Sequence, residues 1–91
     1  MLEHQLPGID KSLARQVVSF VHGLRGEELR KKPGIAETLD WAASLMGLSV
    51  EQLQRDPDLL LDTLPCLLKT REDRAAIDRP VVEGILARGV A

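Results

Sequence analysis

Apolar side chains between residues 13 and 24 recur at the spacing of an α-helix. The five that share one helical face are Leu13, Val17, Phe20, Val21 and Leu24. Asp10 precedes them, and its carboxylate can accept hydrogen bonds from the free amides of a first helical turn, while Gly26 follows and ends the pattern. The spacing therefore predicts an amphipathic helix over residues 10–25, whose apolar face must pack against other elements.

A second helical pattern covers residues 35–47 and is apolar around most of its circumference. One stripe consists of Ile35, Leu39, Ala42 and Met46, and a second of Trp41, Leu45 and Leu48. The remaining polar line consists of Glu37, Asp40 and Ser44. A helix that is apolar on most sides is typical of the middle of a bundle. We therefore expect this helix to be the central, most buried element, with Trp41 out of water and Gly47 at its C-terminal end.

Capping residues predict several short helices in the second half of the chain. Ser49 with Gln52, and Thr70 with Asp73, have the spacing of a capping box. Aspartates also precede prolines at Asp56-Pro57 and at Asp78, two residues before Pro80, as at the first turn of a helix. The leucines between these signals are expected to face inward, and they are Leu60, Leu64, Leu67 and Leu68. Pro65 interrupts them, which predicts a kink or a restart over residues 63–65.

The composition supports a helical fold. Leucine and alanine supply 16 and 8 of the 91 residues, whereas the only aromatic side chains are Phe20 and Trp41. Leucine and alanine favour helices, and aromatic and β-branched residues favour strands. With 44% hydrophobic residues, the chain is long enough for one core and too short for two. We therefore predict a single all-α domain over residues 1–91, a small bundle of about five or six short helices with no sheet.

Several functional classes are disfavoured by what the sequence lacks. The net charge is −2, so the chain lacks the excess of basic residues expected for nucleic-acid binding. No apolar run is as long as the roughly 18 residues that a membrane-spanning helix needs. Cys66 is the single cysteine and cannot form an internal disulfide, which favours a cytoplasmic location. The chain has no phosphate-binding loop, no GxSxG and no HExxH motif. We therefore expect no catalytic residue and no enzymatic activity in this chain alone.

Neither a metal site nor a catalytic carboxylate pair is strongly indicated. His4, His22 and Cys66 are scattered, with no spacing that places two on one helix face, so no metal site is expected. Glu37 and Asp40 lie three residues apart on one face, as a pair for acid-base chemistry would. The simpler interpretation is a solvent-facing stripe in which Glu37 complements the helix dipole. Asp40 is also placed to pair with an arginine of a neighbouring element.

A basic run, Arg30-Lys31-Lys32, stands immediately before the Pro33-Gly34 break. Such a run is able to contact phosphate, but Glu27 and Glu28 lie just upstream and no aromatic residue is interleaved with it. Composition alone favours a solvated connector between two helices.

The order of these features resembles a known family. The chain contains Leu24-Arg25, then LRKKPGIAETLDWA over residues 29–42, then Thr63-Leu64 and LLKTRED over residues 67–73. With Pro7-Gly8-Ile9 upstream, this succession resembles the C-terminal helical lid of MoxR-like AAA+ ATPases. The similarity covers about residues 5–75. Its specific part is KKPGIAETLDWA, because leucine-rich helices alone match many bundles.

The resemblance implies a domain fragment of a larger, oligomeric ATP-binding protein. The P-loop core of that family, with its Mg-binding motif and arginine finger, lies upstream of the lid and is not in this chain. ATP and Mg²⁺ are then cofactors of the full-length protein and not of this chain alone. The implied partners are the upstream core, neighbouring subunits of a ring and a von Willebrand A domain protein. The implied function is chaperone-like remodelling or maturation of client proteins.

The resemblance also directs attention to Lys31 and Lys32. A lid of this family often presents a cationic sensor-2 residue at the start of a helix, but residues 34–37 contain no arginine. The nearest substitutes are the two lysines, as cations near a bound phosphate, while Glu37 is expected to cap the helix or bind a neighbouring subunit. The alternative is a free-standing helical protein-interaction module without nucleotide binding. The genomic sequence upstream of Met1 discriminates between the two.

Overall fold

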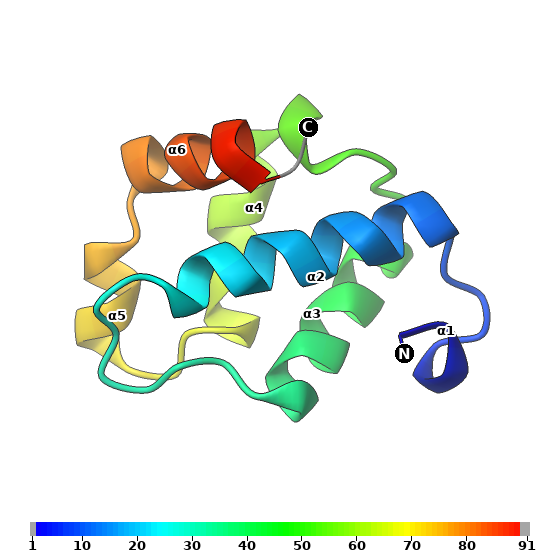
Figure 1. Cartoon of the computed structure of the whole chain (residues 1–91), viewed down its shortest axis with the longest axis horizontal. Helices are drawn as coiled ribbons and strands as arrows, with labels where there is room; N and C mark the ends of the chain where they lie inside the picture. Colours follow the sequence, from blue (N-terminus) through cyan, green and yellow to red (C-terminus); the bar gives the residue numbers. More distant parts are fainter. Residues whose placement is uncertain (1, 90–91) are drawn as a thin grey trace.

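The computed structural model describes residues 2–89, which form helices joined by turns and loops (Figure 1). The α-helices are α1 (Leu2–Gln5), α2 (Lys11–Arg25), α3 (Ile35–Gly47), α4 (Pro57–Thr63), α5 (Arg71–Ala76) and α6 (Arg79–Gly89). Two short 3₁₀ helices, η1 (Leu53–Arg55) and η2 (Leu64–Cys66), flank α4. No strand occurs between residues 2 and 89, so the prediction of a small all-α bundle without a sheet is confirmed.

Helix α2 begins where the sequence predicts. The carboxylate of Asp10 accepts hydrogen bonds from the N–H groups of Ser12 at 2.9 Å and Leu13 at 3.2 Å, which satisfies two amides of the first turn. At the other end, the N–H of Gly26 donates to the carbonyl of Gly23 at 3.1 Å. The five residues of the predicted apolar face are all buried, and Ala14, which was not part of that prediction, is buried with them.

Helix α2 is the central element. It runs through the middle of the view in Figure 1, between α6 and α3, and packs against both. Its contact with α3 includes the rings of Phe20 and Trp41, whose centroids are 5.2 Å apart. Its contact with α6 is close at Gly23, where a Cβ atom would lie 2.6 Å from the Cγ2 of Ile85. The lack of a side chain at Gly23 therefore sets how near the two helices come.

The prediction that residues 35–47 form the most buried helix is wrong. Four residues of α3 are buried, against six in α2, and Ile35 and Leu48 at the two ends of its apolar stripes are 65% and 52% exposed. Helices α2 and α4 and the turn η2 contact α3, but Ala36, Asp40, Ala43 and Gly47 along the helix stay exposed. An apolar circumference shows what a helix is able to bury, but the neighbours available decide how much of it is covered. Trp41 is fully buried, as predicted.

The C-terminal end of α3 is a Schellman motif. Ser49 has φ of 58°, and the N–H groups of Ser49 and Val50 donate to the carbonyls of Met46 and Leu45, both at 3.0 Å. The predicted stop at Gly47 falls on the last helical residue, two positions early for the left-handed residue. The predicted capping box at Ser49 is wrong, because this residue ends α3 instead of starting the next helix. Only the 3₁₀ turn η1 follows.

Helix α4 and the turn after it confirm the predicted break at the proline. Asp56 caps α4 by accepting from the N–H of Leu59 at 3.1 Å, and Pro57 occupies the first turn. Helix α4 ends at Thr63, and Pro65 lies within η2. The leucines expected to face inward are all buried.

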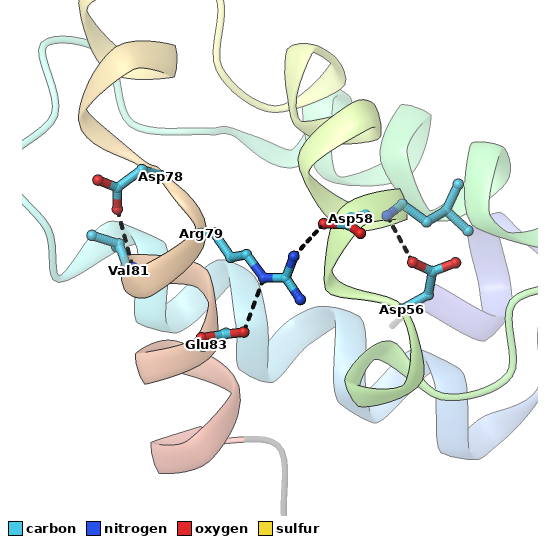
Figure 2. A network of polar contacts seen from close by, with 7 residues as sticks. Asp56, Asp58, Asp78, Arg79, Val81 and Glu83 are labelled. Atoms are coloured by element: carbon cyan, nitrogen blue, oxygen red, sulfur yellow. Dashed lines mark hydrogen bonds and ion pairs between the residues drawn. The ribbon is translucent and has the colours of Figure 1, made fainter.

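Helix α6 is tied to α4 at the surface (Figure 2). Its cap is Asp78, which accepts from the N–H of Val81 at 3.2 Å. The guanidinium of Arg79 lies 2.8 Å from Asp58 of α4 and 3.1 Å from Glu83 of its own helix. The three charged side chains are half exposed or more, so these ion pairs add little to stability. Buried contacts between α4 and α6 hold the two helices together.

Candidate functional site

The two lysines singled out in the sequence lie on the connector between α2 and α3, residues 26–34. Lys31 and Lys32 are both exposed, whereas the neighbouring Pro33 is fully buried. Neither lysine side chain forms an ion pair or a hydrogen bond with another residue in the range 2–89. Their ammonium groups are therefore available to an anion outside this chain.

The end of the connector that leads into α3 is held by side chains on both sides. Arg25 donates from Nη1 to the carbonyl of Pro33 at 2.7 Å. Glu37 accepts from the N–H of Gly34 at 2.7 Å, and the hydroxyl of Thr38 donates to the carbonyl of Gly34, also at 2.7 Å. Glu37 thus caps α3, as expected. The backbone immediately after the two lysines is fixed by these three hydrogen bonds.

The middle of the connector is held by Asp73 of α5. This aspartate is only 2% exposed. Its Oδ1 atom accepts from the N–H of Arg30 at 2.8 Å, and its Oδ2 atom accepts from the N–H of Lys31 at 3.0 Å. One carboxylate therefore binds two consecutive backbone amides that are 43 and 42 positions earlier in the sequence. In Figure 1, α5 lies beside the connector, at the end of the molecule where α2 ends.

These hydrogen bonds favour the charged form of Asp73. The N–H of Arg30 is the largest cause that lowers the pKa of this carboxyl, and burial acts in the opposite direction. The N–H of Lys31, the hydroxyl of Thr70 and the charge of Arg30 lower the pKa further. The net pKa is below the ordinary value, so Asp73 is ionised at neutral pH and its two hydrogen bonds are charge-assisted.

The sequence predicts a capping role for Asp73, but the partner of its carboxylate differs from that prediction. In the predicted capping box, Thr70 and Asp73 serve the first turn of one helix. Half of this is confirmed, since the hydroxyl of Thr70 accepts from the N–H of Asp73 at 3.1 Å. The carboxylate of Asp73 is used on the connector instead. The only signal of this in the sequence is an aspartate at a helix start that already has a capping threonine.

The segment beside the connector adds positive charge to this end of the molecule. Lys69 and Arg71 are exposed and lie within four residues of Asp73, on the segment that contacts the connector. Neither forms an ion pair with a residue in the described part of the chain. The nearby exposed carboxylates are those of Glu28 and Glu72. Together with Arg30, Lys31 and Lys32, Lys69 and Arg71 make five exposed cations against these two exposed carboxylates.

The other candidate residues are not brought together. Glu37 is engaged with Gly34 and Asp40 is exposed, and Asp40 forms no ion pair with an arginine among residues 2–89, contrary to one expectation. His4 and His22 are exposed, and Cys66 is half-buried with its Sγ 3.6 Å from the hydroxyl of Ser44. The described residues contain no group of three or more potential metal ligands. Within them, no helix combines the length and the apolar character that crossing a membrane requires.

A surface groove between α2 and α6 is a second place where side chains converge. It has a volume of about 340 Å³ and is lined by Ser19, His22, Gly23, Gly26, Glu27, Ile85 and Arg88. Arg88 reaches Glu27 at 3.4 Å across it. The charges of Arg88 and Glu27 therefore offset each other, and the groove attracts an anion less strongly than the connector does.

The sequence matches no protein-family model, and the comparisons with curated proteins and with solved structures gave no match either.

Proposed function

We propose that this chain is the C-terminal helical lid of a MoxR-like AAA+ ATPase. In this role it closes over nucleotide bound by an upstream core and couples ATP hydrolysis to chaperone-like remodelling or maturation of client proteins in the cytoplasm. The support is the succession of sequence runs over residues 24–73 and the all-α bundle in which they are found. The bundle alone is compatible with many functions, so the proposal depends on the connector.

One observation carries the proposal. The connector backbone is fixed by Asp73, Arg25 and Glu37, whereas the ammonium groups of Lys31 and Lys32 have no partner within the described residues. A fixed backbone helps such cations to stabilise negative charge that develops elsewhere, because only their side chains and not the connector must then be ordered. Phosphoryl transfer is catalysed largely by such positioned charge.

The lysines are better suited to this role than the start of α3. A free helix N-terminus attracts anions through its exposed amides and its positive dipole end. Here the carboxylate of Glu37 occupies the N–H of Gly34 and places negative charge at that end. An approaching phosphate is therefore favoured by Lys31 and Lys32 and disfavoured by the helix start that follows them.

In this role, the remaining parts of the nucleotide site belong to other chains or domains. This sequence has no loop to cradle phosphates and no Mg²⁺ site of the P-loop type, so ATP and Mg²⁺ are bound by the upstream core. The partners are that core, neighbouring subunits of a ring and a von Willebrand A domain protein. Calorimetric titration of the isolated chain with Mg-ATP is expected to show no saturable heat at micromolar protein.

The first test is the reading frame upstream of Met1, which is expected to continue into a P-loop ATPase. The second is steady-state ATP hydrolysis by that full-length protein carrying Lys31→Ala with Lys32→Ala. Removing two cations that act mainly in the transition state is expected to lower kcat by at least about tenfold, with a smaller change in KM. The matched control is Lys11→Ala with Arg15→Ala, which removes two exposed cations from α2.

Unchanged turnover in a double variant that still forms rings would remove the two lysines from the nucleotide site. A bona fide start codon with no ATPase coding sequence upstream would instead favour the free-standing interaction module. Equal losses in the lysine variant and in the control would indicate a general effect of net charge.

A further inference from the structure

Asp73 is the one buried acid of the described chain, and both of its oxygens are used on a segment that has no secondary structure of its own. We infer that Asp73 is the positioning residue of the candidate site: it fastens the connector to α5, so that Lys31 and Lys32 move with the body of the lid and not as a flexible loop. Its consequence for catalysis rests on the function proposed above, whereas the fastening itself does not.

The geometry shows why a carboxylate is needed. Two consecutive amides point at one side chain, and an ionised aspartate is able to accept both bonds with separate oxygens. An asparagine has one acceptor oxygen, and its NH₂ group would face a backbone N–H. No other described side chain or backbone carbonyl accepts a hydrogen bond from the N–H groups of Arg30 and Lys31. Without Asp73, these amides would be left to water and the chain around them would regain conformational freedom.

Asp73 is itself held rigidly, which allows it to transmit a position. Its N–H donates to the hydroxyl of Thr70 at 3.1 Å, and its carbonyl accepts from the N–H of Ile77 at 3.2 Å. Ile77 is 2% exposed and belongs to the core. Hydrogen bonds of Asp73 therefore connect Ile77 of the core to the backbone amide of Lys31 in the connector.

The other anchors do not replace this one. Arg25 and Glu37 hold Pro33 and Gly34, on the α3 side of the two lysines. Asp73 holds the α2 side, at Arg30 and Lys31. The backbone is therefore held on both sides of Lys31 and Lys32. Loss of Asp73 would free the backbone on the α2 side.

The first experiment measures amide hydrogen exchange by NMR in the chain described here, carrying Asp73→Asn. The amides of Arg30 and Lys31 are expected to exchange at least about tenfold faster, because their acceptor is lost. The matched control is Asp78→Asn, which makes the same chemical change at an exposed helix cap that does not touch the connector. A milder variant, Thr70→Ala, loosens the hold on Asp73 and is expected to give an intermediate increase. Protection of the core amides shows whether each variant is folded.

The second experiment measures ATP hydrolysis by the full-length protein and separates positioning from general stability. Asp73→Asn is expected to lower kcat with little change in KM. Adding it to the double variant Lys31→Ala with Lys32→Ala is expected to cause no further loss, because a residue that acts through the lysines has no effect in their absence. A purely structural role would make the two losses multiply.

Two results would overturn the inference. Unchanged exchange at Arg30 and Lys31 in Asp73→Asn would show that the carboxylate does not fasten the connector. Multiplying losses in the combined variant would show that Asp73 does not act through the lysines. If the lysine variant alone hydrolyses ATP normally, the proposed role of the lysines fails, and the exchange experiment still decides whether the connector is fastened.

Discussion

The indole Nε1 of Trp41 donates a hydrogen bond to the hydroxyl of Thr63 at 2.9 Å, and that hydroxyl donates in turn to the carbonyl of Leu60 at 3.0 Å. Trp41 is fully buried, and its Nε1 is the one polar atom in the side chains of the Phe20–Trp41 ring pair. The bond therefore satisfies a group that would be costly to bury unpaired, and it fixes α3 against the end of α4.

The first prediction concerns this tryptophan. Trp41→Ala removes the largest buried side chain, and we expect it to lower the free energy of unfolding by about 3–5 kcal/mol. Thr63→Val keeps the shape but leaves the indole N–H unpaired, at a cost of about 1–3 kcal/mol. Urea denaturation measures both. In the unmodified chain, the tryptophan emission maximum is expected at the short wavelengths of a buried indole, and emission typical of hydrated indole would contradict the structure.

The second prediction uses two glycines in facing helices. Gly23→Ala adds a methyl group that meets Ile85 at 2.6 Å, and Ile85 is buried and branched, so it has little room to yield. Overpacking of this kind costs about 1–3 kcal/mol and outweighs the gain of about 1 kcal/mol from higher helix propensity. Gly84→Ala in α6 meets nothing within 4 Å and is expected to stabilise the fold by up to about 1 kcal/mol. Effects of the same sign would contradict the close α2–α6 approach.

The third prediction concerns the left-handed residue that ends α3. Ser49 has φ of 58°, a conformation in which a side chain is strained and glycine is not. Ser49→Gly is expected to raise the free energy of unfolding by about 0.5–1 kcal/mol, since relief of strain exceeds the added entropy of the unfolded chain. Thermal unfolding followed by circular dichroism measures the change. The control is Ser44→Gly, within α3, which is expected to destabilise.

Local patterns predict α2 to α6 because the determinants of these helices are local, whereas α1 (Leu2–Gln5) is not among the predicted helices. The ends of α2 follow from a cap at Asp10 and a glycine at residue 26, and Pro65 marks the break after α4. The burial of α3 is lower than its sequence predicts, because the sequence of one helix does not show which sides its neighbours cover. Ser49 lies in the turn that ends α3, where the sequence predicts a helix start, because a serine suits either position.

The candidate site was predictable only in part. Lys31 and Lys32 stand out in the sequence because they precede a Pro-Gly break. The residue that holds them, Asp73, does not, since its hydrogen bonds join positions 42 and 43 residues apart. No local spacing rule connects such positions. The local hint is that Thr70 already caps the first turn of α5, so the carboxylate of Asp73, three residues later, is not needed there.

The last prediction is the pH dependence that Asp73 imposes on stability. The pKa of its carboxyl is lowered in the folded chain, first by the N–H of Arg30, whereas an aspartate in the unfolded chain has a pKa of about 3.9. Between these two values the unfolded chain binds more protons than the folded chain. The contribution of the ionised group is therefore fully present above the unfolded pKa and is lost as the pH falls through the folded pKa.

The measurement compares thermal unfolding of the unmodified chain and of Asp73→Asn from pH 7 to about pH 2. The unmodified chain is expected to have the higher Tm at neutral pH, by about 5 °C or more, as suits the loss of a charge-assisted anchor in a small domain. The difference is expected to stay constant down to about pH 5 and to shrink below the unfolded pKa near 3.9, because protonation then removes from the unmodified chain what the substitution has already removed. Asp78→Asn provides the comparison for a cap without a long-range partner. A Tm difference for Asp73→Asn that is the same at pH 7 and pH 2 would show that the charge of this carboxylate does not hold the connector.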